Sequence, residues 1–146
     1  MLRNTIFILL FSLSATLFSQ VKDQQFPLAP NSIKLHGNLE NDIQNSLVNW
    51  NKGVLPYATF VDLFRVGRTQ FALGEMWGKA TRSASLFYRY TQDPELKTIL
   101  DETVKDLLST ERPNGSISCS PIEKQPESAT GDIWERKYVM LGLMDY

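Results

Sequence analysis

Two tryptophans, one arginine and one glutamate have side chains that suit sugar binding: Trp77, Trp134, Arg136 and Glu75. The flat face of an indole stacks on the apolar side of a pyranose or furanose ring. A guanidinium presents a planar fork of N–H donors that matches sugar hydroxyls. These four residues are therefore the candidate sugar-binding residues of the chain.

Each candidate also has a purely structural interpretation. Trp77 fits core packing, and Arg136 fits a salt bridge between helices. Glu75 stands at the start of a predicted helix, where a carboxylate suits the positive end of the helix dipole. Trp134 lies at the mouth of a predicted apolar helix, and for this residue stacking on a sugar and packing in a core are both open.

Glycoside hydrolysis usually needs two carboxyl groups that face one bond across a fixed gap. The acidic residues near the candidates are Glu75, Glu111, Glu123, Glu127 and Asp132. No two of them have a spacing that fixes such a gap, so no catalytic residue is assigned. Cys119 is the only cysteine, and one thiol forms neither an internal disulfide nor a Cys-rich zinc site. No cofactor or metal ligand is therefore assigned within this chain.

The composition is that of an ordinary globular domain. The chain has 146 residues, 42% of them hydrophobic, and a formal net charge of −1. Its 15 Lys and Arg residues are scattered among 16 Asp and Glu residues. Because this balance gives no basic patch, nucleic acid and anionic membranes are not expected partners.

Residues 1–19 have the pattern of a secretory signal peptide. A short positive start, Met1–Asn4, precedes an apolar run to Phe18 and a small residue, Ser19. The run is shorter than the roughly 20 apolar residues of a spanning helix. We expect cleavage after Ser19, no membrane association afterwards, and a secreted or periplasmic protein. An uncleaved N-terminal anchor is the alternative.

The remaining sequence predicts an all-α fold. Residues 20–54 read as a lead-in followed by a helix that Asn38 caps, and residues 55–146 read as helical hairpins. Asp93, Pro94 and Glu95 have the order typical of a helix start, so the helices before and after them should form an antiparallel pair. Tyr57–Gly67 is either a short helix or an irregular wall.

Apolar residues at helical spacing predict the buried faces. In the first helix these residues are Ile43, Leu47, Trp50 and Val54. In the helix that begins near Glu75 they are Met76, Trp77, Ala80, Ala84, Phe87 and Tyr88. In the next helix they are Leu96, Ile99, Leu100, Val104, Leu107 and Leu108.

Residues 111–132 read as a long loop. Asn114-Gly115 predicts a tight turn with positive φ at both positions. Ile117, Cys119 and Ile122 alternate with polar residues, which indicates a short strand pair or an extended lip. The last helix, Ile133–Tyr146, is apolar on most faces and has no cap. Since such a helix needs neighbours to bury it, we expect the chain to be the front part of a larger helical protein.

Several pieces, in order, carry a resemblance to a known family. They are Gly74–Lys79, Tyr90–Leu96, Pro113–Gly115, Trp134–Tyr138 and Leu141–Leu143. Together they resemble the N-terminal part of the beta-L-arabinofuranosidases of glycoside hydrolase family 127. The resemblance covers roughly residues 55–146, and no single piece is diagnostic.

This resemblance implies antiparallel hairpins that form part of an (α/α)6 barrel, and an enzyme that acts on oligosaccharide or polysaccharide side chains containing arabinofuranosides. It also implies a zinc-bound cysteine nucleophile in the full-length family enzyme, well downstream of this sequence. Arg136-Lys137-Tyr138-Val139 stands where the family commonly has a His-Glu-Leu-Tyr phrase, so sugar specificity stays open. The alternatives are a small secreted helical module that binds glycans or a protein without catalysis, and a truncated reading frame.

Overall fold

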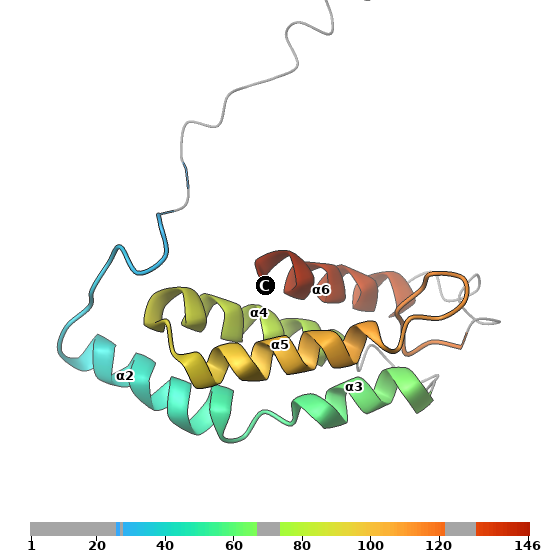
Figure 1. Ribbon diagram of the computed structural model, residues 1–146, viewed down its shortest axis with the longest axis horizontal. Coiled ribbons are helices and arrows are strands. Elements are labelled where there is room, and N and C mark those ends of the chain that lie inside the picture. Colours follow the sequence, from blue (N-terminus) through green and yellow to red (C-terminus); the bar gives the residue numbers. More distant parts are fainter. Residues whose placement is uncertain (1–25, 27, 67–73, 122–130) are drawn as a thin grey trace, which may run out of the picture.

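The computed structural model describes residues 26, 28–66, 74–121 and 131–146, and within these ranges the chain is helical, without strands. Figure 1 shows the helices in their order along the chain. Their bounds are α2 (Asn38–Ser46), η1 (Leu47–Lys52), α3 (Tyr57–Val66), α4 (Gly74–Thr91), α5 (Pro94–Leu108) and α6 (Gly131–Asp145). The all-α prediction is confirmed, and Tyr57–Val66 is a helix rather than an irregular wall. The predicted signal peptide, residues 1–19, lies outside the described ranges.

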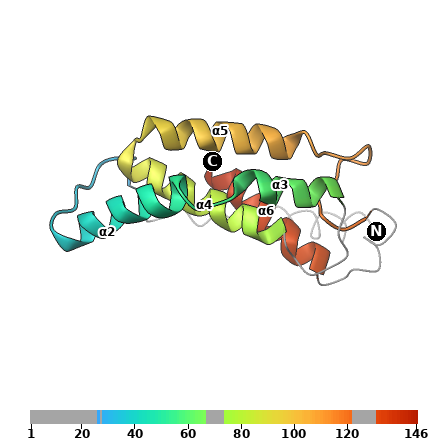
Figure 2. The ribbon, with the colours of Figure 1, turned by 90° about the horizontal axis from the view of Figure 1, so that it is seen from below.

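Successive helices from α3 to α6 run in alternating directions (Figures 1 and 2). The backbone N–H of Gly74, the first residue of α4, donates a hydrogen bond to Glu135 near the start of α6. Further along α4, Arg82 donates a hydrogen bond to Asp145 at the end of α6. These two pairs make α4 and α6 parallel neighbours. Near the other end of α4, the chain reverses into α5, which runs antiparallel to both.

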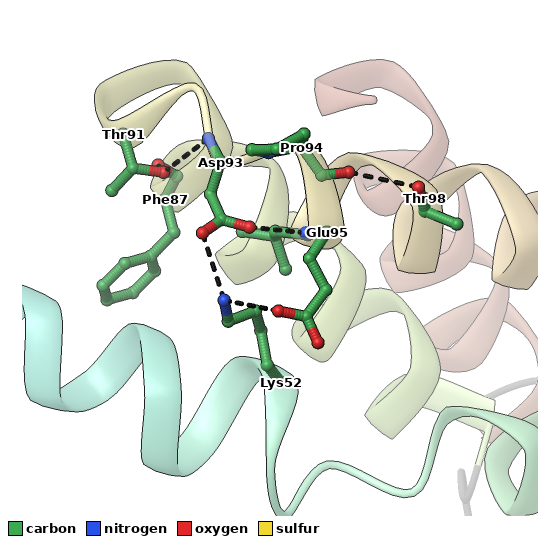
Figure 3. Close-up of polar contacts among 8 residues, drawn as sticks. Lys52, Phe87, Thr91, Asp93, Pro94, Glu95 and Thr98 are labelled. Atoms are coloured by element: carbon green, nitrogen blue, oxygen red, sulfur yellow. Dashed lines mark hydrogen bonds and ion pairs between the residues drawn. The ribbon is translucent and has the colours of Figure 1, made fainter.

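The reversal between α4 and α5 has the predicted chemistry (Figure 3). Gln92 takes a positive φ of 57°, and Asp93 then accepts a hydrogen bond from Leu96 N at 2.8 Å. Pro94 is the first residue of α5. Lys52 of η1 bridges Asp93 at 3.1 Å and Glu95 at 2.7 Å, so the same turn also holds the end of η1.

Two groups of apolar side chains form the core. One lies where α3, α4, α5 and α6 meet and surrounds Trp77; it contains Val61, Phe64, Trp77, Val104, Leu107, Cys119 and Val139. The other joins η1, α3, α4 and α5; it contains Leu47, Tyr57, Ala80, Ala84, Leu96 and Leu100. The predicted faces of α4 and α5 thus supply much of the core. Met76 and Leu108 are exposed instead, because each lies beside the buried stripe of its helix rather than on it.

The buried face predicted for the first helix is wrong beyond Leu47. α2 buries none of its residues, Leu47 is buried, and Trp50 and Val54 are exposed. The cause is η1, a π-helical segment, in which the wider i→i+5 turn moves each later side chain around the axis. Asn51 is buried in place of Trp50. The predicted cap also differs: Gly37, with φ of 70°, precedes the helix, and Asn38 is its first residue.

α4 and α6 approach each other through two glycines. A Cβ on Gly78 would lie 2.1 Å from the carbonyl oxygen of Tyr138, and a Cβ on Gly142 would lie 3.0 Å from the carbonyl oxygen of Gly78. Only residues without a side chain allow the two backbones to lie this close. None of the helices in the described ranges is long and apolar enough to cross a bilayer.

Candidate functional site

Trp134 of α6 and Glu75 of α4 lie together at the shared N-terminal end of these parallel helices. The Trp134 indole N–H donates a hydrogen bond to Glu75 Oε2. Glu75 Oε1 accepts a hydrogen bond from Lys79 Nζ at 3.2 Å. Trp134 keeps 47% of its surface exposed, so an outside ligand has access to it.

Two further residues of α6 complete this group. Lys137 Nζ lies 3.6 Å from the ring centroid of Trp134 and 4.5 Å from that of Tyr138. Lys79 Nζ lies 4.7 Å from the Tyr138 centroid, on the α4 side. The Trp134 and Tyr138 rings meet edge to face at 5.5 Å. We call Glu75, Lys79, Trp134, Lys137 and Tyr138 the α4–α6 surface cluster.

The other two sequence candidates lie elsewhere. Trp77 is completely buried in the core, where its indole N–H donates to Thr103 Oγ1 at 2.9 Å. Arg136 is half-buried on α6. Since residues two positions apart do not share a helix face, Arg136 points away from Trp134. The structure therefore brings together Trp134 and Glu75, but not Trp77 or Arg136.

Next to Trp134 in the sequence is a buried carboxylate that was not among the predicted site residues. Glu135 is only 2% exposed. Its Oε1 accepts hydrogen bonds from Ser118 Oγ at 3.0 Å and Cys119 N at 2.6 Å, and its Oε2 accepts one from Gly74 N at 3.2 Å. This one side chain joins α6, the loop after α5 and the first residue of α4.

A sequence signal for Glu135 existed. Glu135, Val139 and Gly142 follow one another at steps of four and three, which places them on one face of a helix. All three are buried against α4. A carboxylate on the inward face of an apolar helix must find hydrogen-bond donors, and the loop and the start of α4 supply them.

The loop after α5 contacts Glu135 through Ser118 and Cys119. Gly115 N donates to Arg112 O at 2.8 Å, which closes the predicted tight turn. Only Gly115 of the Asn-Gly pair has positive φ, at 79°. Arg112 then donates to Ser118 O at 2.9 Å and to Ser120 O. The sequence left a strand pair and an extended lip open, and the described part of the loop contains no strand. Ile122 lies outside the described residues.

Cys119 is a poor nucleophile in this position. Burial raises the pKa of its thiol far above the ordinary value, and the negative charge of Glu135 raises it further. The thiol therefore stays protonated at neutral pH, and only the thiolate attacks or binds metal well. In the described ranges no three His, Cys, Asp or Glu residues gather as metal ligands.

The described side chains of the surface cluster suit ligand binding. Glu75 is the one carboxylate of the surface cluster, and Glu135 has both oxygens engaged in the interior. A hydrolytic pair needs two carboxyl groups that reach the same bond. The cluster instead offers aromatic surface, hydrogen-bonding groups and two ammonium groups to a ligand that arrives from solvent.

Comparison of the chain with protein-family models, with curated proteins and with solved structures finds no match.

Proposed function

We propose that the shared N-terminal end of α4 and α6 forms one wall of a sugar-binding site in a glycoside hydrolase that resembles the beta-L-arabinofuranosidases. The observation that carries the proposal is the half-exposed indole of Trp134, held by Glu75 beside Tyr138. An indole fixed in this way provides a flat surface for a sugar ring at little entropic cost.

The arrangement of the helices supports the same proposal. In an (α/α) barrel, alternating helices would form two concentric rings, each of parallel members. α4 and α6 are parallel neighbours, and α5 runs against them (Figure 2). On this proposal α4 and α6 belong to one ring and α3 and α5 to the other. Export through residues 1–19 would place the protein where polysaccharide side chains occur.

A second candidate is a secreted helical module that binds glycans or a protein without catalysis. The exposed apolar residues of α6 favour it: Ile133, Met140 and Met144 are 64%, 60% and 76% exposed. An apolar surface of this kind is typical of an interaction surface. The two candidates differ in whether a bond is cleaved, and they share the sugar-binding cluster.

The test compares two exposed tryptophans of the same chain. Arabinofuranose-containing oligosaccharides are titrated against the wild type, Trp134→Ala and Trp50→Ala, with heat of binding as the readout. Trp50 is 55% exposed and lies in η1, away from α6, which makes it the matched control. We expect at least about a ten-fold loss of affinity in Trp134→Ala, the worth of one stacking contact, and none in Trp50→Ala.

Equal binding by all three proteins would overturn the sugar-binding proposal. Release of arabinose by the full-length gene product then separates the candidates. Release that is lost with Trp134→Ala supports the hydrolase, whereas binding without release supports the module.

A further inference from the structure

We propose that the α4–α6 surface cluster selects anionic sugars, and that Lys137 pairs with the carboxylate of a uronic acid unit stacked on Trp134. This inference rests on the proposed sugar-binding site and adds the charge of the ligand to it. It begins with the distribution of charge among the five residues of the cluster.

The cluster holds two ammonium groups and one carboxylate. Glu75 is already shared, because it accepts hydrogen bonds from both Lys79 and the Trp134 indole. Lys137 has no carboxylate within ion-pair distance among the described residues, and its ammonium lies over the two aromatic rings. The cluster therefore presents an excess positive charge to solvent next to its stacking surface.

Lys137 interacts more strongly with the carboxylate of a bound uronate than with the two aromatic rings. An exposed ammonium on an aromatic ring is held less strongly than one in a charge-assisted hydrogen bond to a carboxylate. The lysine stem is flexible, so the ammonium can leave the ring face. The sugar ring then takes the place of the ammonium on Trp134, and its carboxylate receives the ammonium at the rim of the ring.

Position on the helix supports this pairing. Lys137 lies three residues after Trp134, at a spacing that places both side chains on the same side of α6. Tyr138 follows at four residues, and its ring stands edge-on to Trp134 at 5.5 Å. A sugar on Trp134 is therefore next to both the Lys137 ammonium and the Tyr138 ring. A neutral sugar at this place gains the stacking contact but leaves the ammonium without a counter-charge.

The experiment titrates the purified chain with three probes of equal length: a trimer of galacturonic acid, a trimer of galactose, and a sulfated trimer of galactose. Heat of binding is measured at low and at physiological salt. We expect the galacturonate trimer to bind about ten-fold more tightly than the neutral trimer. We also expect added salt to reduce this advantage. Tighter binding of the sulfated trimer than of the uronate would overturn the assignment to a carboxylate.

Two lysine variants make the test specific. Lys137→Gln should abolish the preference for the uronate and keep binding of the neutral trimer. Lys105→Gln is the matched control, because Lys105 is exposed on α5, distant in sequence from the cluster, and should change nothing. Uronate preference that survives in Lys137→Gln, or that falls equally in both variants, would overturn the inference.

Failure of the inference is distinguishable from failure of the proposed function. If neutral and acidic trimers bind equally and both depend on Trp134, the sugar site stands and the anionic selectivity is wrong. If no trimer binds, both are wrong. If the uronate binds independently of Trp134, simple charge attraction explains it and the stacked arrangement is wrong. Circular dichroism of each variant shows that the helices are intact.

Discussion

At the scale of single residues, the interior carboxylate of Glu135 is closely constrained by its hydrogen bonds. Glu135 accepts three hydrogen bonds from three separate residues, Gly74, Ser118 and Cys119. A buried carboxylate is tolerated only when donors compensate for the water that it loses. The local backbone of the loop and the start of α4 therefore depend on this side chain.

Replacement of Glu135 by glutamine should destabilise the protein strongly. The substitution keeps the volume of the side chain but turns one acceptor into an N–H₂ donor that faces other donors. We expect the free energy of unfolding to fall by about 1–3 kcal/mol. Urea unfolding measures the change, and Glu102→Gln, on the exposed face of α5, should change it by less than about 0.5 kcal/mol. Equal effects of the two substitutions would contradict the role of Glu135.

The sequence could predict part of this site. Residue type alone marked Trp134 and Glu75, and the structure places them in contact. Residue type alone could not separate Trp77 from Trp134, because the two indoles differ only in how far the neighbouring helices cover them. Helical spacing marks Glu135 as inward-facing, but its hydrogen-bond donors come from residues 61 and 17 positions away, and no local pattern identifies them.

At the scale of elements, the α4–α5 turn should give a recognisable dependence of stability on pH. The hydrogen bond from Leu96 N, followed by the Lys52 ammonium, holds the pKa of Asp93 below its ordinary value of 3.8. A carboxyl with a lowered pKa contributes stability above the ordinary value, and this contribution is lost as pH falls through the lowered value. The pKa of Lys52 is raised, chiefly by its hydrogen bond to Glu95. Its contribution to stability is therefore fully present below pH 10.5 and is lost as the pH rises through the raised pKa.

Substitution of Asp93 tests this dependence. At pH 7 we expect Asp93→Ala to lose about 1 kcal/mol, the usual worth of an N-cap. Asp93→Asn keeps a capping oxygen and should lose less. Below the lowered pKa, wild type and Asp93→Asn should converge, because the aspartate is then neutral as well. Urea unfolding at pH 7 and at a series of lower pH values measures both differences, and a gap between wild type and Asp93→Asn that does not narrow as the pH falls would refute the linkage.

The contact between α4 and α6 predicts an unusual response to alanine. In an ordinary helix interior, Gly→Ala stabilises by about 1 kcal/mol. Gly78→Ala should instead destabilise by about 2 kcal/mol or more, because the new Cβ would lie 2.1 Å from Tyr138 O. Gly142→Ala, with its nearest contact at 3.0 Å, should be milder. Thermal unfolding of the two variants shows which one loses more stability. A larger loss in Gly142→Ala than in Gly78→Ala would show that the helices move apart at little cost.

The sequence predicted a helix end correctly where the residues that form it are close together in the chain. Asp93 and Pro94 act within four residues of one another, so the start of α5 was readable. The π-helical segment η1 was not, because a widened turn carries no sequence mark that differs from a regular helix. Its consequence is visible at Trp50, which periodicity places inside and the structure places outside.

At the scale of the whole molecule, stability should be distributed unevenly. α2 buries none of its residues and has no side-chain cap, whereas α4 and α5 supply most of the buried side chains. We expect hydrogen exchange to reach the amides of α2 first and those around Trp77 last. Protection of α2 as strong as that of α5 would mean that the helices unfold together.

Fold class was readable from the whole sequence, and the way the helices are arranged was not. Amphipathic periodicity indicates helices and their inward faces, so the all-α class followed. That α4 and α6 lie parallel depends on contacts between Gly78 and Tyr138, 60 residues apart. Such contacts follow from which surfaces fit each other, and a single sequence does not report that fit.

The parallel pairing of α4 and α6 has an electrostatic consequence. Each helix carries roughly half a positive charge at its first turn, and parallel neighbours bring these like charges side by side, where they repel. The carboxylate of Glu135, which α6 carries, accepts a hydrogen bond from Gly74 N at the start of α4 and offsets the positive charge there. Two helices that would otherwise favour opposite orientations can thus share one direction, and both present their first turns to the same side of the molecule.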